Sequence, residues 1–275
     1  MIARYFFWAM AGATGVMCLQ AGAQIVPKSI AGRRHGPRMA ASARGDAVGH
    51  VSSTARDVWK RSEVVCFDVD STVCSSEGID DLAAFLGKGE EVAAFTAKAM
   101  SGSVPFEEAL AARLDILRPS RGQIETFLRE DAPALTPGVA TLVAALQAKG
   151  KDVYLVSGGF RVMIDPVADE LGIPRRNVFA NTILFDEGTG EYADFDAEEF
   201  TSRAGGKARA ARHIKDLTGA TVLAMVGDGA TDLEARQPGG ADIFVGYGGI
   251  VRREAVLEQA DWAVSDFDEL TRALD

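Results

Sequence analysis

Short and almost entirely apolar runs recur along residues 60–275, and stretches with helical patterns separate them. The runs are Val64–Phe67, Val153–Val156, Val178–Ala180, Val222–Val226 and Ile243–Val245, with Trp262–Val264 as a candidate edge. Continuous apolar runs are typical of strands buried on both faces, as in a parallel sheet covered by helices on both sides. The pattern therefore predicts an α/β fold with a parallel sheet core.

The first two runs are separated by about 80 residues, which is more than one crossover helix needs. Residues 138–149 supply that helix, with Thr136 as its N-cap, Pro137 at its first position and Gly150 ending it. Four more helical patterns precede it: Ile79–Leu86, Glu90–Met100, Pro105–Leu117 and Arg121–Arg129. Because this insert follows the first strand directly, we predict a helical-bundle cap at 78–135 on a core of residues 51–77 and 136–275.

Two further segments interrupt the alternation of strands and helices. Residues 183–195 place apolar residues on both sides of Asp186–Gly190, which predicts a hairpin flap. Pro166 falls inside the helix expected over Phe160–Leu171, and an interior proline costs about 3 kcal/mol. Either Asp165 caps a new helix that begins at Pro166, or one helix is kinked there.

The charge is distributed unevenly along the 275 residues, of which 47% are apolar and 25% charged. Residues 1–45 contain six Arg or Lys and no acid, whereas the rest contains 23 basic and 39 acidic residues. The acidic balance argues against nucleic acid as a partner, because a phosphate backbone requires a basic face. It leaves a phosphorylated small molecule open as substrate, since a metal and a few local cations can neutralise one phosphate.

The acid-free start is typical of a targeting segment, and residues 1–50 are predicted to be a presequence. An apolar stretch, Tyr5–Cys18, follows Arg4, and Ala21–Ala23 resembles a signal-peptidase site. An Arg-, Ser- and Ala-rich stretch then resembles a transit peptide, and this order predicts a plastid, with the mitochondrion or cytosol as alternatives. A plain secretory signal or a membrane anchor also stays open, although the run is short for a spanning helix. No membrane association of the mature part is expected.

The three cysteines do not form a disulfide framework. Cys18 lies in the predicted presequence, Cys66 lies in a buried strand, and Cys74 lies near the candidate site. We interpret Cys74 as a packing residue.

The strongest chemical signal is Asp68-Val69-Asp70-Ser71-Thr72, which follows the first strand directly. Ligands in open α/β sheets bind outside the carboxyl ends of the strands. Two carboxylates at this spacing can both act on one bound ligand, one as a nucleophile and the other as an acid or base. A solvated acidic turn is the alternative interpretation of this motif alone.

Three more clusters lie where strands or helices would face the same crevice. Ser157-Gly158-Gly159 follows the second strand and could bind an anion, although such loops are common. Lys207 opens the helix 208–217, where a cation opposes the helix dipole unless an anion lies in front of it. Asp228 and Asp232, separated by small residues, suit an octahedral Mg²⁺ site with several waters.

The four clusters in this order resemble the haloacid-dehalogenase superfamily of phosphotransferases, and within it the eukaryotic-type phosphoserine phosphatase family. The resemblance covers about residues 60–275. It includes cap residues as well as the catalytic set, over Phe67–Thr72, Glu77–Asp80, Met100–Phe106, Ser157–Arg161, Asn177–Asn181, Gly206-Lys207 and Gly227–Asp232. It implies a Rossmann-like core with an inserted cap, and Mg²⁺-dependent hydrolysis of O-phospho-L-serine, the last step of L-serine biosynthesis.

The resemblance also implies roles for individual residues. Asp68 is the nucleophile that forms an aspartyl-phosphate, and Asp70 is the general acid and then the base. Mg²⁺ is held by Asp68, Asp228 and the Asp70 backbone carbonyl, and Asp232 orients them. The phosphoryl-binding residues are Ser157, Gly158, Gly159 and Lys207, with Thr231 as a further contact. Because Asp70 must be protonated for the first step, neighbouring charge is expected to raise its pKa when substrate binds.

The cap residues are expected to select the substrate. Arg113 lies on the apolar stripe of helix 105–117, where it is either a snorkelling residue or an anion ligand. The resemblance makes it the clamp for the substrate carboxylate. Glu77 would bind the ammonium group, Met100 would line the site, and Arg253 would close the phosphate end, while solvent exposure or core packing is the alternative for each. Ser101-Gly102-Ser103 departs from the family, in which paired glycines are common at this point.

Alternatives of two kinds stay open. One is another small-molecule phosphatase or phosphotransferase of the same superfamily, in which an alcohol replaces water as acceptor. The other is a receiver-like phospho-switch, which has no need of Asp70 or of a cap. The oligomeric state is left open between a monomer and a homodimer.

Overall fold

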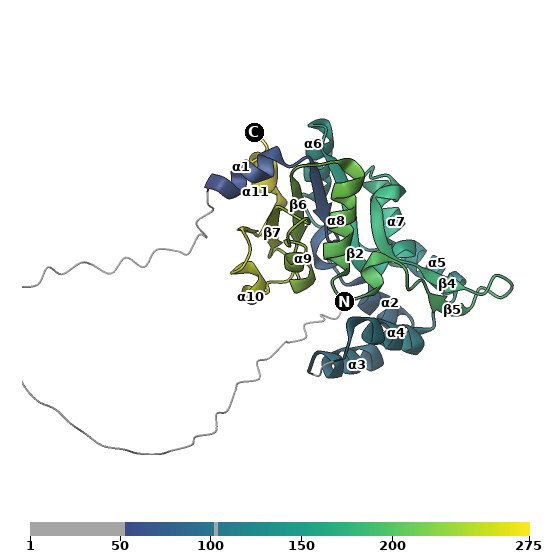
Figure 1. Cartoon of the computed structure of the whole chain (residues 1–275). Coiled ribbons are helices and arrows are strands. Elements are labelled where there is room, and N and C mark those ends of the chain that lie inside the picture. The colour runs from purple at the N-terminus through teal and green to yellow at the C-terminus, as the bar shows by residue number, and fades with distance from the viewer. Residues whose placement is uncertain (1–52, 102–103) are drawn as a thin grey trace, which may run out of the picture. The chain divides into compact units, whose positions relative to one another are not determined.

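The core of the protein is a parallel sheet of six strands in the order β3-β2-β1-β6-β7-β8 (Figure 1). The strands are β1 (Val64–Phe67), β2 (Asp152–Phe160), β3 (Val178–Asn181), β6 (Leu223–Gly227), β7 (Ile243–Tyr247) and β8 (Trp262–Val264). The computed structural model describes residues 53–101 and 104–275. Every predicted strand is present within one or two residues at its start, and the α/β fold with a parallel sheet is confirmed. The predicted presequence lies outside the described residues.

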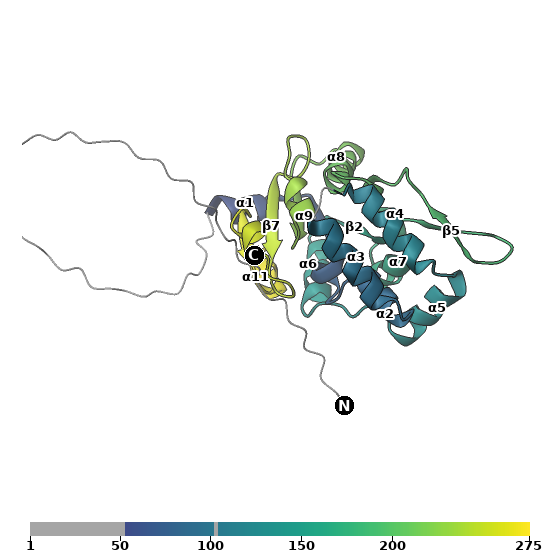
Figure 2. The same cartoon turned by 90° about the horizontal axis from the view of Figure 1, so that it is seen from below.

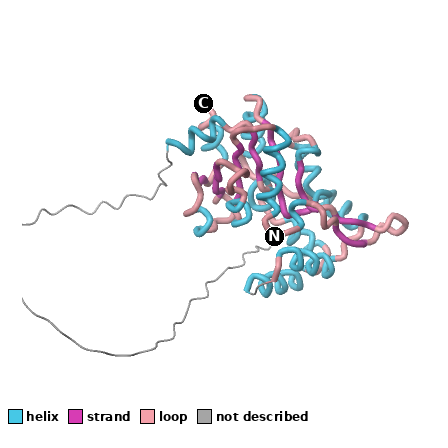
Figure 3. Tube along the Cα trace, in the orientation of Figure 1, coloured by secondary structure: helices cyan, strands magenta, loops and turns pink. Residues whose placement is uncertain are grey.

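Alternate residues of the strands face two separate apolar cores, one on each side of the sheet. Val65 and Phe67 of β1 face one core, and Val64 and Cys66 face the other. Figure 3 shows helices on both sides of the sheet. The first core is covered by α1 (Ser53–Arg61), α6 (Val139–Ala148), α7 (Arg161–Glu170) and α11 (Phe267–Arg272). The second is covered chiefly by α8 (Gly206–Thr218), with residues of α10 (Glu254–Leu257) and the end of α9 (Ala230–Glu234).

Four consecutive helices lie between β1 and α6. They are α2 (Gly78–Phe85), α3 (Gly89–Ser101), α4 (Phe106–Leu117) and α5 (Arg121–Glu130). Ser120 and Gln123 form a capping box at the start of α5. The Lys88 ammonium donates to the carbonyls of Ile116 (2.7 Å) and Leu117 (2.9 Å), which satisfies the last turn of α4. Figure 2, which views the molecule from below, shows these four helices grouped together. All four predicted helices are confirmed.

The crossover helix α6 begins later than predicted. Its N-cap is Gly138, at φ 85°, and not Thr136. Thr136 instead donates its backbone N–H to Val73 (2.8 Å), so it belongs to the segment that runs beside the loop after β1. This tertiary bond holds Thr136 beside the loop after β1, and Gly138, in the left-handed region, makes the turn into the helix.

Pro166 lies inside a single helix, α7, so of the two alternatives the one in which Asp165 caps a new helix is wrong. The proline removes one backbone hydrogen bond. Four residues of the helix are buried around it: Met163, Ile164, Val167 and Ala168. Burial of these side chains, at about 1.5–3 kcal/mol for each large one, offsets the lost bond.

The predicted hairpin is present as β4 (Ile183–Phe185) and β5 (Tyr192–Phe195), which pair antiparallel. It packs on the α4–α5 region, because the guanidinium of Arg118 stacks 5.3 Å over Tyr192 and that of Arg121 stacks 4.9 Å over Phe185. The Arg121 N–H also donates to the Gly190 carbonyl (2.8 Å). The hairpin is thus attached to the helices that precede α6.

Both cysteines of the described part are buried and free. Burial raises the pKa of Cys74 to about 12, so the thiol stays protonated and inert. The interpretation of Cys74 as a packing residue fits this burial. Among the helices of residues 53–101 and 104–275, none has the length and apolar character that crossing a membrane requires.

Candidate active site

A cavity of about 260 Å³ lies where the carboxyl ends of β1, β2 and β6 meet α4. Its polar lining includes Asp68, Asp70, Glu77, Arg113, Lys207, Asp228, Thr231 and Arg253, together with the backbone of Gly158 and Gly159. These come from segments as distant as residues 68 and 253 in sequence. The clusters expected to meet at one crevice therefore do so.

The backbone after β1 aims two carboxylates into this cavity. The Asp68 N–H donates to the Val226 carbonyl (2.9 Å), which extends the β1–β6 pairing to the last residue before the turn η1 (Val69–Val73). Ser71 adopts φ 54°, a left-handed conformation that is costly for a residue with a side chain. Its hydroxyl donates to Glu77 (2.7 Å), the N-cap residue of α2, and this bond holds the turn at the N-terminal end of that helix.

Asp70 has the environment of a general acid. Its carboxylate accepts hydrogen bonds from the Gly78 N–H (2.8 Å) and from the Ser157 hydroxyl (3.2 Å). Burial, followed by the charge of Asp68, raises the pKa of Asp70 to about 7. Asp70 can therefore carry a proton near neutral pH. The sequence prediction assigned the shift to neighbouring charge with substrate bound, and burial is already the larger cause of the raised pKa without substrate.

The raised pKa of Asp70 predicts a pH-dependent stability. Between about pH 4 and pH 7 the folded protein keeps a proton on Asp70 that the unfolded chain has released, so this group lowers stability as the pH rises through that window. For metal-free Asp70→Asn we expect no change in the free energy of unfolding at pH 4. At pH 8 we expect an increase of more than about 1 kcal/mol over the wild type. Urea unfolding in EDTA measures this, and Asp57→Asn, on an exposed face of α1, should show no such trend.

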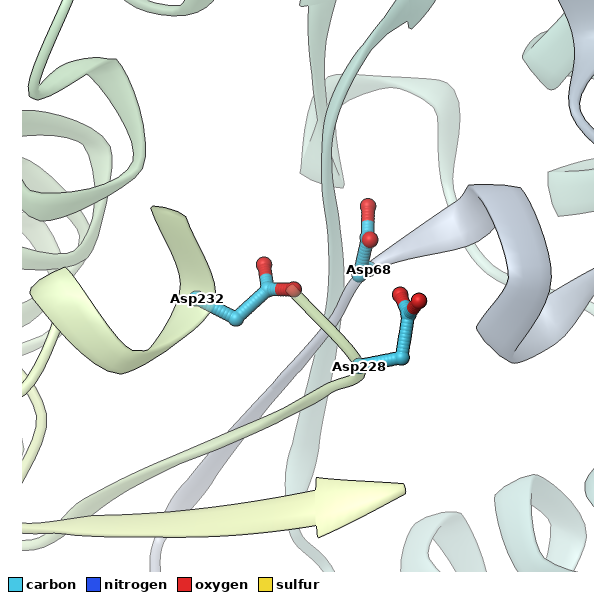
Figure 4. Close-up of side chains that lie close together, drawn as sticks. All are labelled: Asp68, Asp228 and Asp232. Atoms are coloured by element: carbon cyan, nitrogen blue, oxygen red, sulfur yellow. The ribbon is translucent and has the colours of Figure 1, made fainter. Parts of the chain in front are cut away.

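Asp68, Asp228 and Asp232 form a buried acidic cluster whose ligand atoms all lie within 4.8 Å of one another (Figure 4). Such close carboxylates repel one another unless a cation neutralises them. One oxygen of Asp228 is buried without a hydrogen-bond partner, although Arg253 forms an ion pair with it. Three hard oxygen donors with a spare lone pair suit a divalent cation such as Mg²⁺.

Gly227 is required for the approach of Asp232 to this cluster. A Cβ at Gly227 would lie 2.3 Å from the Asp232 carboxylate. Asp232 also accepts a hydrogen bond from the Gly229 N–H (2.9 Å), which fixes the loop between β6 and α9. The small residues of this motif thus allow two aspartates four apart to converge.

Lys207 is the buried cation of the site. Its ammonium lies 2.6 Å from both Asp68 and Asp232, and the side chain is 8% exposed. Burial alone would lower the pKa of Lys207, but the carboxylates of Asp232 and Asp68 outweigh it and raise the pKa above its usual range. Gly206 lets α8 begin tightly against η3 (Phe200–Ser202), because a Cβ there would meet the Phe200 carbonyl at 2.3 Å.

One side of the cavity comes from α4. Phe106, Leu110 and Arg113 line it, and the Arg113 Nε donates to the Ala109 carbonyl (3.2 Å). Burial lowers the pKa of Arg113, although nearby acids including Asp80 oppose the shift. A partly buried guanidinium with such a shift retains its charge at neutral pH.

Three of the predicted residues are placed differently from the others. Ser157 is fully buried beneath the cavity, where its hydroxyl contacts Asp70 and accepts from the Gly159 N–H (2.8 Å). Asp232 lies behind Lys207 and not on the cavity wall. Met100 lies in α3, but its side chain is outside the part of the chain that the structure describes.

One wall of the cavity was not predicted from the sequence. Thr201, Arg203, Ala204 and Gly205, from η3 and the loop before α8, all line it. Of these, only Gly205 had a signal, as the residue before Gly206-Lys207. Phe106 and Leu110 also line the cavity, and they belong to the apolar stripe of helix 105–117, but helical spacing alone does not say what a stripe covers.

The comparisons with known proteins agree with this geometry. The haloacid dehalogenase-like hydrolase family matches residues 63–240. The match includes the carboxylate pair after β1, Lys207 and the acidic loop after β6. The chain therefore belongs to the haloacid dehalogenase-like hydrolases.

Individual relatives identify a narrower family within the haloacid dehalogenase-like hydrolases. The chain is 56% identical over 219 residues to the chloroplastic phosphoserine phosphatase of Arabidopsis thaliana, covering 80% of this chain and 74% of that protein. It is 44% identical over 223 residues to the phosphoserine phosphatase of Homo sapiens, covering 81% and 98%. These identities place the chain within the phosphoserine phosphatase family.

Two solved structures resemble the fold. The structure of DsGPDH of Dunaliella salina has a TM-score of 0.74 and 38% identity, covering 82% of this chain and 38% of that one. A structure described as a phospho-aspartyl intermediate analogue of phosphoserine phosphatase has a TM-score of 0.66 and 25% identity, covering 78% and 100%.

Proposed function

We propose that the protein hydrolyses O-phospho-L-serine to L-serine and phosphate, with Mg²⁺ bound at the acidic cluster. The observation that carries this proposal is one cavity in which Asp68 and Asp70 face Arg113 of α4. Membership of the phosphoserine phosphatase family supports the substrate, and the matching family is one of hydrolases. The match to a hydrolase family also disfavours a receiver-like phospho-switch, because such a switch has no use for Asp70.

The two carboxylates divide the reaction between them. The Asp68 carboxylate attacks phosphorus, and the bond from phosphorus to the seryl oxygen breaks. Asp70, protonated near neutral pH, gives its proton to that oxygen, so serine leaves neutral at its hydroxyl. Asp70 then removes a proton from the water that hydrolyses the aspartyl-phosphate, and this restores both groups.

The metal would be held by Asp68, Asp228 and the backbone carbonyl of Asp70, with Asp232 orienting the cluster. A bound Mg²⁺ supplies charge neutralisation between the carboxylate and the phosphate. Lys207 supplies further positive charge beside Asp68. Gly158, Gly159 and Ser157 complete the proposed cradle for the phosphoryl oxygens, with Thr231 at its edge.

We also propose that residues 78–135 act as a cap that selects the substrate. Phe106, Leu110 and Arg113 line the cavity, and the N–H of Ala204, which also lines it, donates to Glu107 of α4 (3.4 Å). Arg113 would bind the substrate carboxylate, and Glu77 the ammonium group. Arg253, an ion-pair partner of Glu77 (3.7 Å) and Asp228, would close the phosphate end, and Met100 would add apolar lining.

Release of phosphate from phospho-L-serine in the presence of Mg²⁺ tests the proposal. We expect turnover of phospho-L-serine to exceed that of phosphoethanolamine and glycerol 3-phosphate, which lack the carboxylate or both substituents. Equal turnover of all three would instead favour a general small-molecule phosphatase. Added alcohols that divert phosphate to a new ester would identify a phosphotransferase.

A substitution at Arg113 tests the carboxylate clamp separately. Arg113→Lys keeps the charge but loses the bidentate fork. We expect kcat/KM for phospho-L-serine to fall about 10- to 100-fold, because a charged hydrogen bond contributes about 1.5–3 kcal/mol. Turnover of phosphoethanolamine should change less than about threefold, because this compound has no carboxylate for Arg113 to bind. Arg118→Lys, on an exposed side chain, is the matched control, and an equal loss on both substrates would contradict the clamp.

We propose a plastid location for the protein, supported by the chloroplastic relative from Arabidopsis thaliana and by the acid-free residues 1–45. Fusion of residues 1–50 to a fluorescent protein tests this location, and cytosolic fluorescence would overturn it.

Light scattering of the mature protein distinguishes the monomer from the homodimer.

A further inference from the structure

Strand β2 departs from regular pairing at the point where it enters the active site. Val156 pairs with Phe179 of β3, but the next paired residue, Phe160, is opposite Asn181. Three residues of β2, Ser157–Gly159, therefore stand opposite Ala180 alone. Such bulges redirect the backbone, and here they turn Gly158 and Gly159 toward the cavity.

Asn181 holds this bulge in place. Its side chain is 0% exposed, and its amide donates to the Gly158 carbonyl at 2.7 Å. An unpaired buried carbonyl is costly, so this bond fixes the peptide that follows Gly158. Asn181 belongs to the motif Asn177–Asn181, which the sequence analysis noted without assigning it a role.

The other end of the same amide contacts a second residue of the cavity lining, Thr201. Its carbonyl oxygen accepts a hydrogen bond from the Thr201 hydroxyl (3.0 Å), and Thr201 is 3% exposed. Thr201 in turn packs against the start of α8, because a Cβ at Gly206 would lie 2.7 Å from the Thr201 Cα. The next residue along α8 is Lys207.

We propose that Asn181 is a positioning residue that sets the distance between the two halves of the phosphoryl cradle, the Gly158 bulge on one side and the Lys207 end of α8 on the other. This inference rests on the proposed function. Among the described residues the amide is hydrogen-bonded to Gly158 and Thr201 and not to Asp68 or Asp70, so it acts through Gly158 and Thr201. Both the nitrogen and the oxygen of the amide are hydrogen-bonded, so the amide can adopt only one orientation.

Three variants separate this role from simple packing. Asn181→Leu keeps the size of the side chain and removes both hydrogen bonds. Thr201→Val removes only the hydroxyl donor to Asn181, and Thr201→Ser retains it. If Asn181→Leu does not fold, the two threonine variants, which each change a single group, still carry the comparison.

The test measures inhibition by the two products separately, with phospho-L-serine as substrate and saturating Mg²⁺. Asn181→Leu and Thr201→Val are expected to raise the inhibition constant of inorganic phosphate about tenfold or more, and to lower kcat up to about 100-fold, because small displacements of a positioning group cost that much. The inhibition constant of L-serine should change by no more than about twofold, because the proposed contacts of L-serine are on the cap. Loss of one contact to L-serine would instead raise that constant about tenfold. Thr201→Ser should behave like the wild type.

A second readout does not depend on turnover. Stabilisation by inorganic phosphate with Mg²⁺, measured as a shift in Tm, should be lost in Thr201→Val and kept in Thr201→Ser. An unchanged phosphate constant, or equal weakening of phosphate and L-serine, would overturn the proposal. Failure of the wild type to turn over phospho-L-serine would refute the proposed function instead, while the Tm comparison with phosphate would still decide on Asn181.

Discussion

Asp68→Asn is expected to abolish phosphate release, with kcat lowered by about 10⁴-fold or more, as in other enzymes whose nucleophile is removed. The amide has almost the size of the carboxylate but cannot attack phosphorus, so no aspartyl-phosphate can form. The variant can still accept a hydrogen bond from the Val69 N–H, which Asp68 accepts at 2.7 Å. The local backbone should therefore be unchanged.

The loss of activity in this variant should occur without a loss of stability. Asp68 is one of three carboxylates within 4.8 Å, and its removal relieves repulsion in the metal-free protein. Lys207 keeps its ion pair with Asp232 at 2.6 Å. We expect a Tm in EDTA at or above that of the wild type and a smaller increase in Tm on adding Mg²⁺.

Direct detection of the intermediate completes this test. Wild-type protein quenched in acid during turnover should carry a phosphoryl group on the tryptic peptide of residues 62–88, and fragmentation should assign it to Asp68. Asp57→Asn, which changes an exposed aspartate of α1, controls for the substitution and should keep full activity. Retention of more than about 1% of the activity by Asp68→Asn, or a label on Asp70, would exclude Asp68 as the nucleophile.

The features that the sequence predicted are those encoded within a few residues. Each buried strand has its own apolar run, and the aspartates that follow β1 and β6 are adjacent to those runs. In a parallel sheet, every such residue reaches the same edge, so local patterns become a shared site without further information. Arg113 was found for the same reason, because helical spacing alone places it on the stripe that the structure brings over the cavity.

The features that were missed depend on contacts between distant segments. Ser157–Gly159 look like a loop in sequence, but they belong to β2 because β3 pairs on both sides of the bulge. Thr201 has no local signal, and its place on the cavity wall depends on the tight approach of Gly206 to η3. Gly138 replaced Thr136 as a helix cap because Thr136 was already bonded to Val73. In each case a long-range contact outweighs the local preference.

Lys207→Met is expected to destabilise the metal-free protein by about 3–5 kcal/mol, the loss found when one partner of a buried ion pair is removed. The substitution leaves Asp68, Asp228 and Asp232 clustered without the ammonium that lies 2.6 Å from two of them. Urea unfolding in EDTA measures the loss. Lys149→Met removes an exposed pair with Asp275, with lysine 42% exposed, and should cost no more than about 1 kcal/mol.

The same variant distinguishes a charge effect from a packing effect. If repulsion among the carboxylates causes the loss, Mg²⁺ should restore part of the stability, and adding Asp68→Asn to Lys207→Met should restore more than the sum of the single changes predicts. A packing defect would respond to neither. Activity should stay about 10²- to 10³-fold below wild type even with Mg²⁺, because the metal does not replace the charge that Lys207 places beside the phosphoryl group. Full activity of Lys207→Met at saturating Mg²⁺ would assign the residue to folding alone.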